Sequence, residues 1–372
     1  MRIVVAPDSL KGSATAAEAA RAIAEGWQSI RPRDLVTIVP MADGGEGTVD
    51  AVAAALPHSE VLSTRVTGPD GRVVEAAWLR FVDGAGRRTA LVELAEASGL
   101  LLLSEPAPLT AHTLGLGEVM RAALDSGVDR LLIAIGGSCS TDGGAGALLA
   151  LGATLVDGHG DSLQLGNAAL HALDHADLTT AVPPPPGGAV VLTDVDNPLL
   201  GSRGAVAVFG AQKGIDDTMA LDAERGLERL AAVLAAGSPE GVSPAAAGAG
   251  AAGGVGFGLL SWGAELAAGA RELAATIGLP AAIADADLVI TGEGRFDGQS
   301  AGGKAPVEVA RLAEAAGVPC ALVAGAIDAE TTAFSDAVSL TDVAGSADSA
   351  MSEPLQWLRR AGARLASAHL AD

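Results

Sequence analysis

The stretch RIVVAPDSLKGSATAAEAARAIAEGWQSI, residues 2–30, reads as a strand, a loop and a helix. Residues 2–6 form a short apolar run, and residues 7–12 interrupt it with proline and glycine. Thr15 followed by Glu18 is a capping box, which marks the start of a helix. Apolar residues then recur at helical spacing as far as Ile30. A strand that leads through a loop into a helix is the unit from which parallel sheets are built.

Similar units occur at both ends of the chain. Near the N-terminus, residues 36–39 predict a strand and residues 49–56 a helix. Near the C-terminus, strands are expected at 288–291 and 320–324, with a helix at 307–316 between them. Because strands alternate with helices, we expect an α/β fold in which both chain ends form a Rossmann-like domain with a parallel sheet.

The middle of the chain is organised differently. A hairpin is expected around residues 68–71, and a helix with an apolar face at 116–124 precedes a buried strand at 131–135. The 372 residues exceed the usual size of one hydrophobic core. We therefore predict two domains: a Rossmann-like domain from residues 1–65 plus 282–372, and an inserted α/β domain at 66–281, with the active site in the cleft between them.

Charge and composition exclude several classes of protein. The formal net charge of −22 would repel nucleic acid and anionic membrane surfaces. The uncharged stretch 241–264 is long enough to span a bilayer but is rich in glycine, so we interpret it as a glycine-rich loop that leads into a helix. Cys139 and Cys320 lie far apart without metal-site spacing, and the N-terminus lacks a signal-peptide pattern. We expect a cytoplasmic protein and leave a homodimer open.

Several loops have the composition of anion-binding sites. Residues 43–47 and 142–146 share the pattern Asp-Gly-Gly-x-Gly, and residues 248–256 form a third glycine-rich run. Such loops present free N–H groups at the start of a helix, although taken singly each is also an ordinary tight turn. The chain has only three lysines, and Lys11, Lys213 and Lys304 each stand next to a glycine, where an ammonium group could reach a phosphate.

Two further segments are rich in polar groups. Asp194 and Asp196 are placed to face the same side of an extended run, which suits either phosphoryl transfer with magnesium or a simple Asx turn before Pro198. Residues 291–300 are expected to form a polar loop after a parallel strand, where open sheets bind ligands. Residues 298–304 fit the spacing of a P-loop, but Ala305 replaces the Ser or Thr that binds Mg²⁺, which disfavours a P-loop NTPase.

Together these runs resemble one family, the bacterial glycerate kinases. The resemblance is carried by eight blocks in order along the chain: APDSLKGS (6–13), DGGEGT (43–48), ELAEASGL (93–100), IGGSCSTDGGAGALLALGA (135–153), DVDNPLLG (194–201), VFGAQKG (208–214), GAGAAGGVG (248–256) and DLVITGEGRFDGQSAGGKAP (287–306). It implies phosphorylation of D-glycerate by ATP with Mg²⁺, most simply at the 2-hydroxyl to give 2-phosphoglycerate. The 3-phosphorylated product and a non-catalytic sensor of sugar acids remain alternatives. A nicotinamide-dependent dehydrogenase is disfavoured because no G-x-G-x-x-G follows the first strand.

The resemblance also suggests roles for particular residues. Asp194 is expected to act as the base, Asp196 as a metal ligand, and Lys11, Lys213 or Lys304 as the charge that stabilises the transferred phosphoryl group. The residues expected to bind the substrate are Ser9, Asp43, Gly44, Gly45, Glu46, Asn197, Glu293, Arg295, Asp297 and Gln299. Those expected to bind the nucleotide phosphates are Gly137, Ser138, Asp142, Gly143, Gly144, Gly253 and Gly254.

Overall fold

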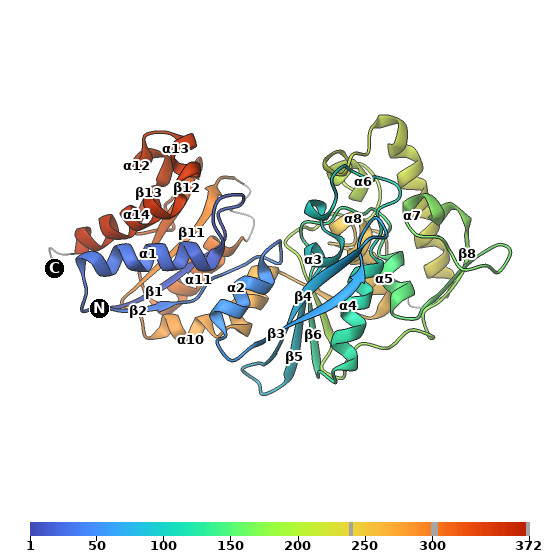
Figure 1. Cartoon of the computed structure of the whole chain (residues 1–372), viewed down its shortest axis with the longest axis horizontal. Helices are drawn as coiled ribbons and strands as arrows, with labels where there is room; N and C mark the ends of the chain where they lie inside the picture. The colour runs from blue at the N-terminus through green and yellow to red at the C-terminus, as the bar shows by residue number, and fades with distance from the viewer. Residues whose placement is uncertain (238–240, 299–303, 370–372) are drawn as a thin grey trace. The chain divides into compact units, whose positions relative to one another are not determined.

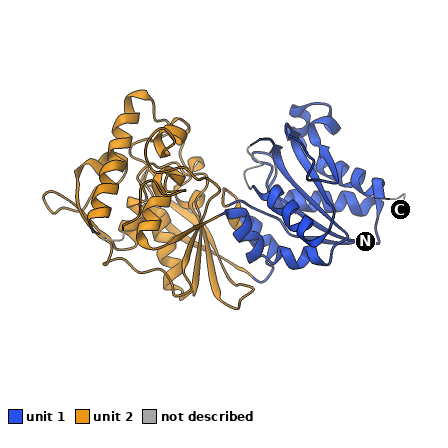
Figure 2. Ribbon diagram, turned by 180° about the vertical axis from the view of Figure 1, so that it is seen from behind, with its two compact units in different colours: residues 1–43, 50–58, 268–372 blue, residues 44–49, 59–267 orange. Residues whose placement is uncertain are grey.

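A computed structural model of the chain describes residues 1–237, 241–298 and 304–369 (Figure 1). Its contacts divide the chain into two compact units, shown in different colours in Figure 2. Unit 1 comprises residues 1–43, 50–58 and 268–372, and unit 2 comprises residues 44–49 and 59–267. The expected α/β fold is confirmed, with a parallel sheet from both chain ends and a second sheet from the middle of the chain.

Unit 1 contains a parallel sheet with the strand order β13-β12-β11-β1-β2. Its strands are β1 (Arg2–Pro7), β2 (Leu35–Ile38), β11 (Leu288–Phe296), β12 (Cys320–Ile327) and β13 (Asp336–Ser339). Its helices are α1 (Ala16–Ile30), α9 (Gly269–Thr276), α10 (Leu279–Ala284), α11 (Ala305–Ala316), α12 (Leu340–Ala344), α13 (Ala347–Ser352) and α14 (Pro354–Ala368), while α2 (Thr48–Ala55) includes residues of both units. Helix α1 lies beside α14 although the two are at opposite ends of the chain (Figure 1).

The start of α1 is fixed by the capping box expected from the sequence. The Glu18 backbone N–H donates to Thr15 Oγ1 at 3.2 Å, and the Thr15 N–H donates to the Glu18 carboxylate at 3.0 Å. These two bonds satisfy N–H groups that a helix terminus otherwise leaves without partners. The buried face of α1 includes Ile23 and Trp27, which pack on the sheet together with Leu358 of α14.

Strand β11 is longer than the sequence predicts. The expected strand ended at Thr291, followed by a polar loop, but the structure continues the strand to Phe296. The extension pairs with β12, so that Glu293 lies opposite Ala324 and Arg295 opposite Ala326. An added Cβ at Gly292 would enter the space of the Val323 carbonyl, so glycine allows the two strands to approach here. Tertiary pairing therefore outweighs the weak strand propensity of this segment.

Unit 2 contains a mixed sheet with the order β10-β9-β6-β5-β4-β3. Its strands are β3 (Glu60–Thr67), β4 (Val73–Val82), β5 (Arg88–Glu93), β6 (Arg130–Ala134), β9 (Ala189–Leu192) and β10 (Glu265–Ala267), and β7 (Thr154–Asp157) pairs separately with β8 (Leu173–Asp177). Its helices are α3 (Leu94–Ser98), η1 (Leu100–Leu102), α4 (Leu114–Asp125), α5 (Ala145–Ala150), η2 (Asn167–Ala172), α6 (Ala205–Phe209), η3 (Ala211–Lys213), α7 (Asp217–Gly237) and α8 (Ala251–Trp262). The expected hairpin is confirmed as β3 and β4, which pair antiparallel.

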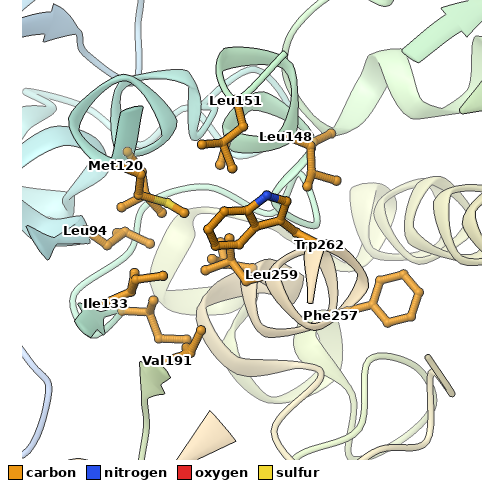
Figure 3. Packing of buried hydrophobic residues seen from close by; sticks show 14 of the residues in the cluster. Leu94, Met120, Ile133, Leu148, Leu151, Val191, Phe257, Leu259 and Trp262 are labelled. Atoms are coloured by element: carbon orange, nitrogen blue, oxygen red, sulfur yellow. The ribbon is translucent and has the colours of Figure 1, made fainter. Parts of the chain in front are cut away.

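The hydrophobic core of unit 2 lies between the sheet and its covering helices (Figure 3). Ile133 and Val191 project from neighbouring parallel strands, Met120 comes from α4, and Trp262 comes from α8. The Trp262 Nε1–H donates to the Val182 carbonyl at 2.8 Å, so the indole gains a polar partner within an apolar setting. The glycine-rich stretch thus leads into a core helix as expected. In the described part of the chain, no helix is long and apolar enough to cross a membrane.

Candidate active site

A cavity of about 400 Å³ lies within unit 1, where β1, β11 and β12 end. Parallel strands bring the loops that follow them to one edge of the sheet, and open α/β sheets bind their ligands at that edge. The Asp8 N–H donates to the Gly292 carbonyl at 2.8 Å. The hydrogen bonding between β1 and β11 therefore continues as far as the residues that line the cavity. The lining residues are Asp8, Ser9, Leu10, Lys11, Ser13, Asp43, Glu293, Gly294, Arg295, Asp297, Lys304, Gly325, Ala326, Leu340, Thr341, Ala347, Ala350 and Met351.

A tight turn after β1 holds Lys11 at the cavity. Leu10 and Ala14 exchange backbone hydrogen bonds of 2.9 and 3.0 Å, and Gly12 between them has a φ of +75°. Residues other than glycine rarely adopt this conformation, so the glycine next to the lysine shapes the turn. The glycine beside Lys11, first noted as a sequence pattern, therefore has a structural role as well.

Charged groups of both signs line this cavity. The carboxylates are Asp8, Asp43, Glu293 and Asp297, and the cations are Lys11, Arg295 and Lys304. Lys304 Nζ lies 4.0 Å from Glu293 Oε2, while the exposed Arg295 pairs with Asp328 at 3.2 Å. Lys304 also occupies the N-cap position of α11, where the helix dipole favours an anion. The arrangement combines groups that attract an anionic ligand with carboxylates that can accept a proton or bind a cation.

The acidity of Asp8 is strongly perturbed. Its removal from water, together with the negative charge of Asp43, raises the pKa of Asp8 to about 8, although the Ser9 N–H and the charge of Lys11 act in the opposite direction. Glu293 adds a further negative charge nearby. A carboxylate with a pKa close to the working pH is suited to proton transfer. The prediction from sequence missed Asp8; its position directly after the first strand was the available signal.

Lys213 lies in unit 2 and is almost completely buried, with 2% of its surface exposed. Its ammonium donates to Ser138 Oγ at 2.8 Å and to the Ser140 carbonyl at 2.6 Å. Burial lowers the pKa of Lys213 to about 8, against the raising effect of Cys139 and Asp142. These hydrogen bonds connect the end of η3 to the loop after β6, so Lys213 links two segments of unit 2.

The second Asp-Gly-Gly loop is part of the same buried region. Asp142 is fully buried and accepts hydrogen bonds from the Thr113 N–H and hydroxyl at 2.9 and 2.8 Å, and from the Gly144 and Gly146 N–H groups at 3.2 Å. The Gly143 N–H donates to the Gly253 carbonyl at 3.1 Å, and Gly254 is buried beside it, whereas Gly137 is exposed. These hydrogen bonds are made within the protein, so they favour a structural role for Asp142 and Gly143 over the predicted binding of phosphate.

The first Asp-Gly-Gly loop is anchored by Glu93, which the sequence prediction did not include. The Gly47 N–H donates to Glu93 Oε1 at 2.8 Å, and the Val49 N–H donates to Glu93 Oε2 at 2.9 Å. A buried carboxylate at the start of α2 complements the positive end of the helix dipole. Gly44 is buried, Gly45 is partly buried and Glu46 is exposed in unit 2, whereas Asp43 belongs to the cavity of unit 1.

The predicted aspartate pair follows β9 in unit 2. Asp194 is partly buried, whereas 77% of the Asp196 side chain is exposed and pairs with Arg203 at 3.2 Å. The Asn197 side chain donates to the Arg203 carbonyl at 2.8 Å. The two carboxylates thus have different surroundings. Gln299, the remaining predicted substrate residue, lies outside the described residues.

Seven predicted residues are brought together by the cavity of unit 1: Ser9, Lys11, Asp43, Glu293, Arg295, Asp297 and Lys304. They come from residues 9–43 near the N-terminus and from residues 293–304 near the C-terminus, and the pairing of β1 with β11 brings these two parts of the chain together. No group of three or more His, Cys, Asp or Glu side chains within residues 1–237, 241–298 and 304–369 is arranged to hold a metal ion. A Mg²⁺ ion that is held by one or two carboxylates and by substrate phosphates needs no such group.

Comparison with known proteins agrees with the resemblance seen in the sequence. The model of the "Glycerate kinase family" matches residues 3–370. The chain is 41% identical over 331 residues to the glycerate 2-kinase of Escherichia coli K12, covering 88% of this chain and 86% of the relative, and 42% identical over 339 residues to the glycerate kinase of Bacillus subtilis 168, covering 90% and 87%. A crystal structure of a candidate glycerate kinase 2 from Salmonella typhimurium LT2 superimposes with a TM-score of 0.85 at 37% identity, covering 100% of this chain and 98% of the other.

Proposed function

The chain belongs to the glycerate kinase family, and from this premise we propose that it phosphorylates D-glycerate with MgATP, at the 2-hydroxyl, to give 2-phosphoglycerate and ADP. The family match identifies a kinase and its acceptor class. The name of the E. coli relative, glycerate 2-kinase, supports the 2-hydroxyl as the acceptor. The observation that carries the proposal is the cavity in unit 1, where three cations and four carboxylates lie at the ends of parallel strands.

In the proposed reaction, the glycerate hydroxyl oxygen attacks the γ-phosphorus of ATP. The hydroxyl proton passes to a carboxylate, the bond from the γ-phosphorus to the bridging oxygen breaks, and its electron pair remains on ADP. Because the transferred phosphoryl group carries much of the charge, the protein contributes mainly by positioning and by electrostatic stabilisation. Lys304 is suited to the phosphoryl oxygens, while Lys11 and Arg295 are suited to the glycerate carboxylate or the remaining phosphates.

Two carboxylates are candidates for the base. Asp194 is favoured by its position in the aspartate pair of the sequence, and Asp8 is favoured by its place in the charged cavity and by its raised pKa. A base whose pKa is near neutrality accepts the proton of the attacking glycerate hydroxyl more readily than an ordinary carboxylate does, because its conjugate acid is weaker. This consideration favours Asp8, and a pair of variants described in the Discussion separates the two.

Mg²⁺ would neutralise phosphate charge and orient the transferred group. Oxygen ligands suit this ion, and Asp297 is a carboxylate of the cavity that fits such a role. Asp196, the predicted ligand, remains a second proposal, although its pairing with Arg203 competes with metal binding.

The unit 2 residues predicted to bind phosphate, and a reaction site between the two domains, also remain predictions. A cytoplasmic location is inferred from the two free cysteines, and a homodimer stays open.

The decisive experiment supplies the purified protein with MgATP and D-glycerate, follows ADP release, and identifies the product by ³¹P NMR. We expect ADP release that requires both D-glycerate and Mg²⁺, with L-glycerate and lactate as matched controls for configuration and for the 3-hydroxyl. Formation of 3-phosphoglycerate would overturn the proposed 2-hydroxyl acceptor but would leave the proposal of glycerate kinase activity standing. Equal ADP release without glycerate would overturn the kinase proposal itself.

A further inference from the structure

The cavity of unit 1 has an apolar wall in addition to its charged groups. This apolar wall consists of Leu340, at the start of α12, and of Ala347, Ala350 and Met351 in α13. The charged groups, in contrast, come from the loop after β1, from the loop that contains Asp43, from β11 with the residue that follows it, and from the start of α11. One cavity therefore offers two kinds of surface to a ligand.

The apolar wall is fixed to the rest of unit 1. The Thr341 hydroxyl donates to the Gly325 carbonyl at 2.8 Å, which joins α12 to β12. The Trp357 Nε1–H donates to the Ser349 carbonyl at 3.0 Å, which joins α13 to α14. Within the wall, Leu340 and Ala350 are buried, while Met351 is 62% exposed. The wall is thus a preformed surface with one adaptable side chain at its edge.

The size of the cavity indicates a ligand larger than glycerate. At about 400 Å³ it falls in the range of pockets that enclose drug-sized molecules, roughly 300–1,000 Å³. A three-carbon acid with a carboxylate and two hydroxyls has little surface for an apolar wall to contact. A nucleotide, however, carries a flat base with apolar faces at one end and a chain of phosphates at the other, which matches the two kinds of surface.

We propose that the apolar wall binds the base of the nucleotide that donates the phosphoryl group, with its phosphates directed toward Lys11, Arg295 and Lys304. This rests on the proposed function only in taking a nucleotide as the donor. It assigns the donor to unit 1, whereas the sequence pattern placed it at the glycine-rich loops of unit 2. The hydrogen bonds of Asp142 and Gly143 within unit 2 are consistent with this change.

The test uses calorimetric titration of the full chain with Mg·ADP and, separately, with Mg·pyrophosphate, which has phosphates but no base. Ala347→Trp places a bulky ring on the exposed part of the apolar wall, and Met351→Ser removes its adaptable side chain. Ser352→Trp is the matched control, because Ser352 is exposed in the same helix but does not line the cavity. Thermal unfolding of each variant checks that unit 1 remains folded.

We expect Ala347→Trp to weaken ADP binding about tenfold or more, with pyrophosphate binding unchanged, since apolar pocket contacts typically discriminate by about 10–200-fold. Met351→Ser should weaken ADP binding in the same direction by less, and Ser352→Trp should leave both ligands unaffected. Unchanged ADP binding in Ala347→Trp and Met351→Ser, or equal weakening of ADP and pyrophosphate, would overturn the assignment of the base. Glycerate phosphorylation by the parent protein is assayed in parallel. If the parent protein binds ADP but does not phosphorylate glycerate, the proposed function alone is refuted. If it phosphorylates glycerate but the wall variants bind ADP as tightly as it does, the assignment of the base to the apolar wall alone is refuted.

Discussion

Lys304 Nζ lies 4.0 Å from Glu293 Oε2, and this pair joins the start of α11 to the C-terminal half of β11 at the wall of the cavity. The Glu293 side chain is only 8% exposed, so the negative charge beside the ammonium is largely withdrawn from water. A poorly solvated counter-charge holds a long lysine side chain in place better than an exposed one does. The Glu293 carboxylate therefore attracts the Lys304 ammonium toward the cavity wall.

Replacing Lys304 with alanine is expected to lower kcat of glycerate phosphorylation by about 10²–10³-fold, the usual effect of removing one group that stabilises transition-state charge. Lys304→Arg keeps the charge and should retain more of the activity. Steady-state kinetics with both substrates varied measures the effect. A rise in KM with kcat unchanged would instead make Lys304 a residue for ground-state binding.

Gly253 offers a test of the buried region around Lys213. Its φ is +71°, and an added Cβ would lie 2.8 Å from Lys213 Nζ and within the space of the Ser140 carbonyl. Gly253→Ala therefore combines backbone strain with a steric clash, and we expect it to lower the free energy of unfolding by about 2–4 kcal/mol. Gly317 is a matched control, since its φ is +70° and nothing lies within 4 Å of an added Cβ.

Gly317→Ala should therefore cost only the backbone term, about 1 kcal/mol. Urea unfolding followed by tryptophan fluorescence gives both values. Equal losses in the two variants would show that the contacts around Lys213 are not tightly packed.

Asp8 should make stability depend on pH in a direction opposite to that of most carboxylates. Because its pKa is raised from 3.8 to about 8, the folded chain binds this proton more tightly than the unfolded chain does. The contribution of Asp8 to stability therefore decreases as the pH rises from about 4 to about 8. Asp8→Asn cannot ionise, so its Tm relative to the parent protein should be higher at pH 9 than at pH 4. The same Tm difference at both pH values would contradict this assignment of the charge state.

Much of the fold follows from local sequence patterns, as the capping box of Thr15 and the β3–β4 hairpin show. The true length of β11 could not be predicted in this way, since Glu293 and Arg295 are strand residues only because β12 lies beside them. The parallel pairing of both chain ends then accounts for the cavity. Most of its charged groups were predictable because polar residues cluster after predicted strands, although Asp8 was missed.

The roles of individual polar residues were harder to predict. The two Asp-Gly-Gly loops have the same local pattern, yet Asp43 lines a cavity and Asp142 is buried with four hydrogen bonds to the protein. Lys213 is also next to glycine, like Lys11 and Lys304, but its ammonium is enclosed by Ser138 and Ser140. Spacing alone does not distinguish these cases, because burial and partners depend on segments that are distant in sequence.

The identity of the base is tested by comparing Asp8→Asn with Asp194→Asn. Each variant keeps the size of the side chain but cannot accept the hydroxyl proton, and loss of a general base typically lowers kcat by about 10²–10⁴-fold. We expect this loss in Asp8→Asn.

In the parent protein, kcat/KM for glycerate should rise with pH toward a plateau above about pH 8, since only the ionised form of Asp8 accepts a proton, and Asp8→Asn should lack this rise. Asp297→Asn is a control for removing a carboxylate from the same cavity and should retain the rise. If Asp194→Asn loses activity to this extent and Asp8→Asn keeps both its activity and the pH dependence, the proton passes to Asp194, and Asp8 has no part in the transfer.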